Sequence, residues 1–138
     1  PTTVVVDHMG RPDVSLPVDG PEFSLFMKML REHANVWSKV SCPERLSVTG
    51  PKALAGEQHA YQDVVPFARS LVDTFPDRVL WGTDWPHPNL KDHMPDDGRL
   101  VDFIPHIATT PALQHRLLVS NPMRLYWPES GPAPSAPP

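Results

Sequence analysis

Short apolar runs alternate along the chain with longer segments in which apolar residues recur at helical spacing. The short runs are bounded by turn-forming residues and predict three buried strands, over residues 2–6, 35–42 and 78–82. The longer segments predict two amphipathic helices, one opening at Gly20-Pro21-Glu22 and one over residues 58–75. Further helices are predicted over residues 100–107, 111–119 after Thr110, and 123–126 after a second cap at Asn121.

The order of these elements is strand, helix, strand, helix, strand and then helices, which is typical of α/β folds with a parallel sheet. The chain holds three βα units, whereas a closed barrel of this type needs eight. The first strand begins directly after Pro1, so we expect truncation on the N-terminal side. The outer strands would carry unpaired edges, so the isolated chain is expected to be inactive and poorly soluble or oligomeric.

Composition and charge exclude several classes of protein. The 138 residues are 40% hydrophobic and 20% charged, as in a globular domain with its own core. A net charge of −4 without a basic run argues against a nucleic-acid partner. No apolar stretch approaches the ~20 residues needed to span a bilayer, so no membrane partner is expected. The single cysteine, Cys42, has no partner for an internal disulfide, which favours a cytoplasmic location.

Proline is unusually frequent, with 19 residues where average usage predicts about 7. Four of these prolines lie in the last seven residues, 132–138. Such a segment buries too little apolar surface to offset its loss of conformational entropy. We therefore divide the chain into one domain over residues 1–129 and a disordered, proline-rich tail over residues 130–138.

Each predicted strand is followed by polar side chains of the types used in catalysis. They are Asp7, His8 and Arg11 after the first strand, Ser41, Cys42, Glu44 and Arg45 after the second, and Thr83, Asp84, His87 and Asn89 after the third. In (β/α) barrels, active sites form at the carboxyl ends of the strands and in the loops that follow them. The pattern therefore predicts one active site built from all three strand ends.

Strand alternation adds detail at three positions. Asp84 falls on the same face as Leu80 and the small residue Gly82, which suits a crowded barrel interior. Lys39 lies in the middle of a strand, either inside the barrel as an ion-pair partner or at an edge, and both alternatives stay open. Cys42 has no base close to it in the sequence and is interpreted as a small buried residue, not as a nucleophile.

The strand-end motifs resemble the amidohydrolase superfamily, and within it the 2-pyrone-4,6-dicarboxylate lactonase branch. The motifs are VVVDHMGRP (4–12), KVSCPERLS (39–47), RVLWGTDWPHPN (78–89) and NPMRLYW (121–127). The resemblance implies an eight-stranded barrel in which these are the sixth, seventh and eighth strands. The fold class it implies is the C-terminal part of a (β/α)8 TIM-like barrel. The family's His-x-His pair on the first strand has no counterpart here.

The resemblance also implies a hydrolase that opens the lactone ring of 2-pyrone-4,6-dicarboxylate during the breakdown of lignin-derived aromatics. Asp84 and His8 match catalytic positions, whereas Arg11, Arg45 and His87 match substrate-binding positions. A carboxylate accepts a proton from the attacking water, an imidazole donates to the carbonyl, and arginine binds carboxylates in bidentate fashion. The implied partners are the small dicarboxylate lactone and the N-terminal half of the barrel.

Metal use is the main alternative within this resemblance. His8 and Asp84 are residue types that bind zinc, and many superfamily members hold a divalent metal. The lactonase branch implies no metal and no other cofactor. Two further functions stay open: a metal-dependent amidohydrolase or decarboxylase of another small carboxylate, and a non-catalytic half-barrel module. The metal content of the complete protein separates the first of these from the lactonase, and turnover excludes the second.

Overall fold

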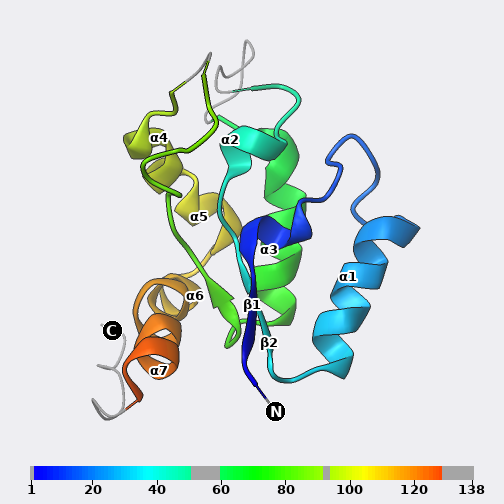
Figure 1. The fold of residues 1–138 in the computed structure, drawn as a ribbon, viewed down its shortest axis with the longest axis vertical. Coiled ribbons are helices and arrows are strands. Elements are labelled where there is room, and N and C mark those ends of the chain that lie inside the picture. The colour runs from blue at the N-terminus through cyan, green and yellow to red at the C-terminus, as the bar shows by residue number, and fades with distance from the viewer. Residues whose placement is uncertain (1, 51–59, 92–93, 129–138) are drawn as a thin grey trace.

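A computed structural model describes residues 2–50, 60–91 and 94–128. Its three parallel strands form one sheet in the order β1-β2-β3, namely β1 (Val4–Val6), β2 (Val36–Lys39) and β3 (Val79–Leu80) (Figure 1). In register, Ser38 of β2 lies between Val6 of β1 and Val79 of β3. The predicted parallel α/β arrangement is confirmed, although each strand is shorter than the sequence pattern indicates.

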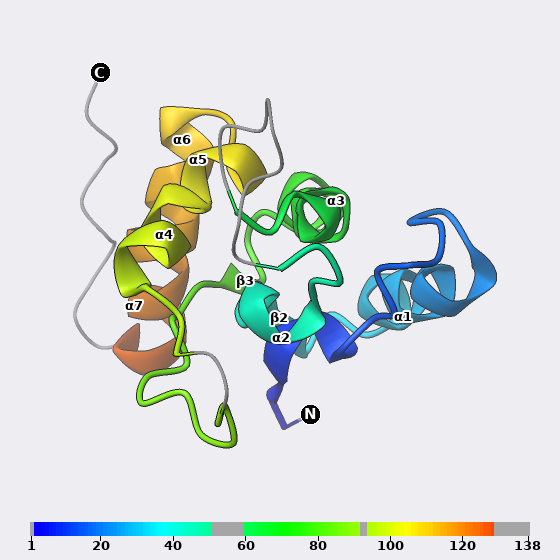
Figure 2. The same cartoon turned by 90° about the horizontal axis from the view of Figure 1, so that it is seen from above.

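The helices follow the strands in the predicted order. α1 (Pro21–Glu32) comes after β1, and α3 (Val65–Thr74) comes after β2. The described residues after β3 include α4 (Asp97–Asp102), α5 (Ile104–Ile107), α6 (Pro111–His115) and α7 (Asn121–Tyr126), with a π-helical turn joining the last two. Single turns connect other elements: η1 (Asp7–Gly10), α2 (Pro43–Leu46) and η2 (Gln62–Val64). Seen from above, α1, α3 and the group α4–α7 form an arc around the strands (Figure 2).

Apolar side chains of α1 and α3 form much of the core. Phe23 of α1 and Phe67 of α3 meet edge to face, with ring centroids 5.0 Å apart. Leu30 and Leu71 are fully buried in the same cluster as Val79 of β3. Each such side chain stabilises the fold by about 1.5–3 kcal/mol relative to full exposure. The helical spacing of the apolar residues thus corresponds to the faces that cover the sheet.

The helix predicted over residues 58–75 begins later than expected. α3 starts at Val65, because Tyr61 has φ 61 in the left-handed region and a short 3-10 turn follows it. Pro66 occupies the first turn of α3, where backbone N–H groups have no partner within the helix, so its missing N–H costs no hydrogen bond. Val64 is buried although it precedes the helix, so the apolar pattern did not locate the helix start. Residues 51–59 lie outside the described residues.

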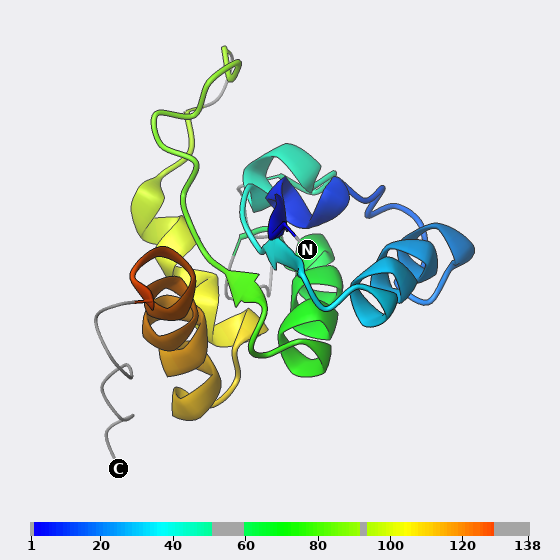
Figure 3. The ribbon, with the colours of Figure 1, turned by 60° about the horizontal axis from the view of Figure 1, so that its bottom comes forward.

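The helix cap predicted at Asn121 is wrong. Residues 111–126 run as one helix that includes a π-helical turn at Arg116–Ser120, and Asn121 has helical φ and ψ angles. The buried Asn121 side chain instead donates hydrogen bonds of 2.8 Å to the carbonyl oxygens of Pro76 and Val79. This amide therefore fastens the last helix to β3, beside which the helix lies in Figure 3.

Two other helix starts are defined by side-chain caps. The Thr110 hydroxyl accepts a 3.2 Å hydrogen bond from the Leu113 N–H, so the predicted start of the helix at Pro111 is confirmed. The segment predicted over residues 100–107 is helical, but it begins earlier and divides into α4 and α5. Asp96 caps α4 by accepting from the Gly98 N–H at 2.8 Å.

The outer strands of the described sheet are β1 and β3. Their outer edges are the reason for expecting the isolated chain to associate. None of the described helices has the length and apolar character needed to cross a membrane. The proline-rich tail predicted over residues 130–138 lies outside the described residues, and the division of the chain at residue 129 stays a prediction.

Candidate active site

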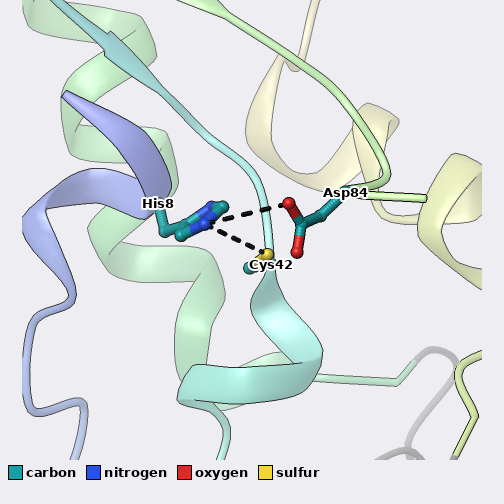
Figure 4. Close-up of side chains that lie close together, drawn as sticks. All are labelled: His8, Cys42 and Asp84. Atoms are coloured by element: carbon teal, nitrogen blue, oxygen red, sulfur yellow. Dashed lines mark hydrogen bonds and ion pairs between the residues drawn. The ribbon is translucent and has the colours of Figure 1, made fainter. Parts of the chain in front are cut away.

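Side chains from all three strand ends meet at the carboxyl edge of the sheet. His8 lies in η1 after β1, Cys42 directly precedes α2 after β2, and Asp84 lies in the loop after β3. The His8 Nε2 atom is 3.9 Å from Asp84 Oδ1 and 3.7 Å from Cys42 Sγ, and the three side chains face one another in Figure 4. Parallel strands place their carboxyl ends at one edge, which is why residues far apart in the sequence converge here.

His8 is held on a tightly wound backbone. His8, Met9, Gly10 and Arg11 all have φ between 52 and 70, in the left-handed region. At Gly10 a Cβ atom would lie 3.0 Å from the ring of Phe26, so both the backbone angle and the space favour glycine. The wound segment points the His8 ring toward the end of β2, where its Nδ1 lies 2.8 Å from the Ser41 hydroxyl oxygen.

Asp84 also has a left-handed backbone, with φ 62. Because β3 ends at Leu80, strand alternation does not extend as far as Asp84, and the predicted parity with Gly82 does not decide its direction. A turn sets that direction instead, since the His87 N–H donates a 2.7 Å hydrogen bond to the Asp84 carbonyl oxygen. Aspartate adopts this region of φ and ψ more readily than most residues.

The two arginines at the strand ends differ in their surroundings. Arg45, in α2, places Nη2 at 2.9 Å from Asp84 Oδ2 and also donates to the carbonyl oxygen of Pro88. Its guanidinium therefore bridges the end of β2 and the loop after β3. Arg11 is exposed at the end of η1. The structure thus brings Arg45 to Asp84, while Arg11 faces solvent.

His87 lies behind the Asp84 turn, only 3% exposed, between two carboxyl groups. Its Nε2 is 2.9 Å from Asp97 Oδ1 at the start of α4, and its Nδ1 is 3.6 Å from Glu44 Oε1 in α2. The Glu44 side chain is fully buried, and burial raises the pKa of its carboxyl above the usual value. Glu44, His87 and Asp97 together join α2, the loop after β3 and α4. The substrate-binding role of His87 stays a prediction.

Replacing Glu44 by Gln is expected to improve stability more at neutral than at acid pH. The folded chain holds the Glu44 proton more tightly than the unfolded chain, so ionisation costs stability as pH rises from about 4.5 through the raised pKa. Glutamine has no proton to lose. The Tm of the variant relative to the native protein should therefore be higher at about pH 7 than at about pH 4, by roughly 2–4 °C for each kcal/mol. Thermal unfolding followed by circular dichroism measures this.

The matched control for this variant is Glu32→Gln. Glu32 is exposed on α1, where its carboxylate pairs with Lys28 at 3.7 Å. Its replacement should leave the dependence of Tm on pH unchanged. Parallel Tm curves for the native protein and the Glu44 variant between acid and neutral pH would contradict the expectation.

Cys42 has a base close in space, although none is close in sequence. Burial, together with the neighbouring Glu44 carboxylate, raises the pKa of the Cys42 thiol well above its usual value despite the nearby His8. The interpretation of Cys42 as a buried residue is confirmed. We expect a neutral alkylating agent at about pH 8 to modify Cys42 at least ~100-fold more slowly in the folded protein than in urea, because only the thiolate reacts. Peptide mass mapping follows this site, and equal rates would contradict the expectation.

Lys39, whose environment the sequence left open, forms an ion pair. Its Nζ lies 2.8 Å from Asp7 Oδ1, and the contact joins β2 to the turn after β1. The hydrogen bond that Lys39 donates to Asp7 raises the pKa of Lys39, and the same contact lowers the pKa of Asp7. Both side chains are more than a third exposed, so solvent screens the pair and its contribution to stability is small.

Sequence reasoning assigned no role to several residues that shape this site. Ser41 and Glu44 stand in the strand-end motif, and their burial gives them partners that the motif does not reveal. Asp97 lies ten positions beyond His87 and carries no sequence signal of its contact. Asp63 holds the segment after α2, since its carboxylate accepts hydrogen bonds from the Ser47 hydroxyl and the Val48 N–H.

Three of the side chains are also of types that bind metals. One ligand atom each from His8, Cys42 and Asp84 lies within 4.8 Å of the others. Nitrogen, sulfur and carboxylate oxygen are the donors that zinc prefers. By distance alone, these residues could contribute part of a metal site.

Comparison with known proteins gives matches over nearly all of the chain. The amidohydrolase family profile matches residues 1–127. A 2-pyrone-4,6-dicarboxylate hydrolase of Comamonas testosteroni is 81% identical over 129 residues, which are 94% of this chain and 42% of that protein. A 4-sulfomuconolactone hydrolase of Hydrogenophaga intermedia is 40% identical over 124 residues, 88% of this chain and 38% of that protein. The chain thus spans about two fifths of the length of these relatives.

Solved structures match the fold over a similar share of their length. An Agrobacterium tumefaciens crystal structure without ligand has a TM-score of 0.71 and 30% identity, covering 91% of this chain and 42% of that one. A zinc-bound amidohydrolase from Burkholderia multivorans has a TM-score of 0.66 and 20% identity, covering 91% of this chain and 44% of that one. The latter likeness concerns the fold alone. The α/β arrangement of this chain corresponds to a C-terminal part of a TIM-like barrel.

Proposed function

The chain belongs to the amidohydrolase family, and from this premise we propose that the complete protein hydrolyses the lactone ring of 2-pyrone-4,6-dicarboxylate. The identity of 81% to the Comamonas testosteroni hydrolase supports this substrate. The 40% identical hydrolase acts, by its name, on another lactone, which supports the reaction class. The remaining strands of the barrel, and any His-x-His pair on the first of them, belong to the complete protein in this proposal.

One observation carries the proposal: the Asp84 carboxylate stands between an imidazole and a guanidinium. His8 Nε2 is 3.9 Å from one of its oxygens and Arg45 Nη2 is 2.9 Å from the other. Water attacks the lactone carbonyl carbon while Asp84 accepts its proton, and His8 donates a hydrogen bond to the developing oxyanion. The bond from that carbon to the ring oxygen then breaks, and the proton passes to the ring oxygen. The products are an open-chain enol and a new carboxylic acid, which releases its proton to solvent and becomes a carboxylate.

The substrate carries two carboxylates, and its binding is assigned to cations at the strand ends. We assign this role to Arg11 and Arg45, whose planar guanidinium groups suit bidentate contact with a carboxylate. Arg45 Nη2 lies 2.9 Å from Asp84 Oδ2. A substrate carboxylate near Asp84 would share or take over this guanidinium. His87 is the third residue to which the resemblance gives a substrate-binding role, and its side chain lies between Glu44 and Asp97.

A metal does not fit the charges around Asp84, and we propose that the reaction uses none. The Arg45 guanidinium already neutralises Asp84 at 2.9 Å, and a divalent cation beside it would be repelled. A cysteine binds zinc as a thiolate, and burial raises the pKa of the Cys42 thiol, which makes Cys42 a poor ligand here. Of the three possible ligands, only His8 is affected neither by the Arg45 charge nor by a raised thiol pKa.

The cytoplasmic location expected from the single cysteine is part of the same proposal.

The experiment is an assay of the protein encoded by the complete gene. Loss of the pyrone absorbance with 2-pyrone-4,6-dicarboxylate is expected, and it should persist after incubation with a chelator and removal of metal. Stoichiometric metal whose removal abolishes turnover would favour the metal-dependent alternative. A folded protein that turns over neither this lactone nor other small carboxylates would favour a non-catalytic module.

A further inference from the structure

Ser41 is a buried polar residue at the end of β2 whose hydroxyl reaches the active site. Only 2% of the residue is exposed, and its Oγ lies 2.8 Å from the Nδ1 atom of His8. The contact joins residues 33 positions apart and is the hydrogen bond that holds the inner side of the His8 ring. A neutral imidazole has one nitrogen that donates and one that accepts, and the partner of one nitrogen determines the role of the other.

The surroundings of Nε2 indicate which nitrogen carries the hydrogen. Asp84 Oδ1 lies 3.9 Å from Nε2, and an ionised carboxylate only accepts hydrogen bonds. A lone pair on Nε2 would face this negative charge, whereas an N–H would be attracted to it. The sulfur of Cys42, 3.7 Å from Nε2, accommodates either form because a thiol both donates and accepts weakly. Electrostatics therefore favour the hydrogen on Nε2 and leave Nδ1 as an acceptor.

We propose that Ser41 is a positioning residue, which donates its hydroxyl hydrogen to Nδ1 and thereby fixes His8 as an Nε2–H donor. Serine is suited to this task, because its hydroxyl rotates to donate wherever an acceptor lies. The catalytic consequence rests on the proposed function, in which Nε2–H stabilises the oxyanion formed from the lactone carbonyl. The opposite tautomer would direct a lone pair at the oxyanion and oppose the reaction.

The ring also needs a fixed orientation, which the Ser41 contact supplies. The backbone at His8 sets only the direction of the Cα–Cβ bond, and a half-turn about the Cβ–Cγ bond would put ring carbons where Nδ1 and Nε2 now lie. A 2.8 Å hydrogen bond from a buried strand end opposes that rotation. Ser41 acts through His8 and touches neither the water nor the lactone in this arrangement.

Nuclear magnetic resonance of the protein from the complete gene tests the proposal without any substrate. Histidine is labelled with 15N, and long-range correlations are recorded at about pH 8.5, two units above the pKa of free histidine. The His8 signals are assigned by their loss in His8→Gln. We expect protonated Nε2 and a hydrogen-bonded, unprotonated Nδ1. A native protein in which Nδ1 carries the hydrogen would overturn the proposal.

Three serine variants separate positioning from a general structural role. Ser41→Ala should move the Nδ1 resonance to the position of an unbonded nitrogen and lower kcat about tenfold with little change in KM, as expected for loss of one hydrogen bond in the transition state. Ser41→Thr keeps the hydroxyl and should restore both values. Ser38→Ala is the matched control, because Ser38 is equally buried three residues earlier, in β2, and its Oγ has no hydrogen-bond partner among the described residues.

The outcomes distinguish this inference from the proposed function. An unchanged Nδ1 resonance in Ser41→Ala would overturn the positioning role, whatever the enzyme hydrolyses. A change in the resonance that threonine reverses would support the role even if the lactone proved to be the wrong substrate. If kcat fell equally in Ser41→Ala and Ser38→Ala, this would also count against the positioning role, since packing alone would then explain the loss.

Discussion

Replacing Asp84 by asparagine is expected to lower kcat for lactone hydrolysis by about 10²–10⁴-fold, the usual contribution of a positioned general base. Asparagine has nearly the same shape and still accepts a hydrogen bond from Arg45, but it takes no proton from water. It also tolerates a positive φ, so the turn at φ 62 should be retained. The expected result is therefore a folded protein with an intact Tm and almost no turnover. Steady-state kinetics with thermal unfolding of the same preparation measures both quantities.

Asp77→Asn is the matched control for the Asp84 substitution. Asp77 precedes β3 at the opposite end of the strand, and its exposed carboxylate pairs with Arg116 at 3.1 Å. The control should leave kcat unchanged within about twofold, because an exposed pair contributes little. Near-native turnover by the Asp84 variant would show that another group accepts the proton and would remove Asp84 from the mechanism.

Replacing Arg45 by lysine is expected to raise KM for the dicarboxylate by roughly 10–100-fold, more than it lowers kcat. The Arg45 guanidinium contacts both the Asp84 carboxylate and the Pro88 carbonyl oxygen, and only 15% of its side chain is exposed. A lysine ammonium keeps the charge but lacks the planar fork that makes two contacts at once. Loss of a charge-assisted hydrogen bond costs about 1.5–3 kcal/mol, which corresponds to this range of binding. Initial-rate kinetics over a range of lactone concentrations separates KM from kcat.

Arg116→Lys serves as the control, since Arg116 makes an exposed pair with Asp77 away from the strand ends that carry the site. Its KM and kcat should match those of the native protein. If Arg45→Lys lowered kcat strongly and left KM unchanged, Arg45 would act mainly on Asp84 and the substrate carboxylate would have to be bound elsewhere.

Several features of the chain follow from local sequence patterns. Three apolar runs separated by helical periodicity were sufficient to predict three parallel strands with helices after each, because side-chain periodicity reflects which face is buried. The same patterns placed polar residues at the carboxyl ends of the strands, and parallel pairing brings those ends to one edge. The meeting of His8 and Asp84 was predictable for this reason, although the 3.9 Å between them was not.

Other features depend on contacts between residues that are distant in sequence. Asp84 points toward His8 because of a left-handed turn, and strand alternation carries no information beyond Leu80. Asn121 resembles a helix cap in sequence, yet it is buried against β3, where two carbonyl oxygens accept its hydrogen bonds. Tyr61 interrupts the helical geometry that the apolar periodicity continued to indicate.

The sequence by itself determined the fold class, the order of the elements and the strand ends at which the polar residues would gather, because each of these depends on residues close together in the chain. Only the tertiary structure decided that Arg45 pairs with Asp84, that Ser41 holds His8, and that His87 is enclosed by Glu44 and Asp97. These pairings join residues 10 to 43 positions apart, and the packing of separate elements sets their distances. A charged side chain has several possible partners in a sequence, and the packing at the strand ends selects among them.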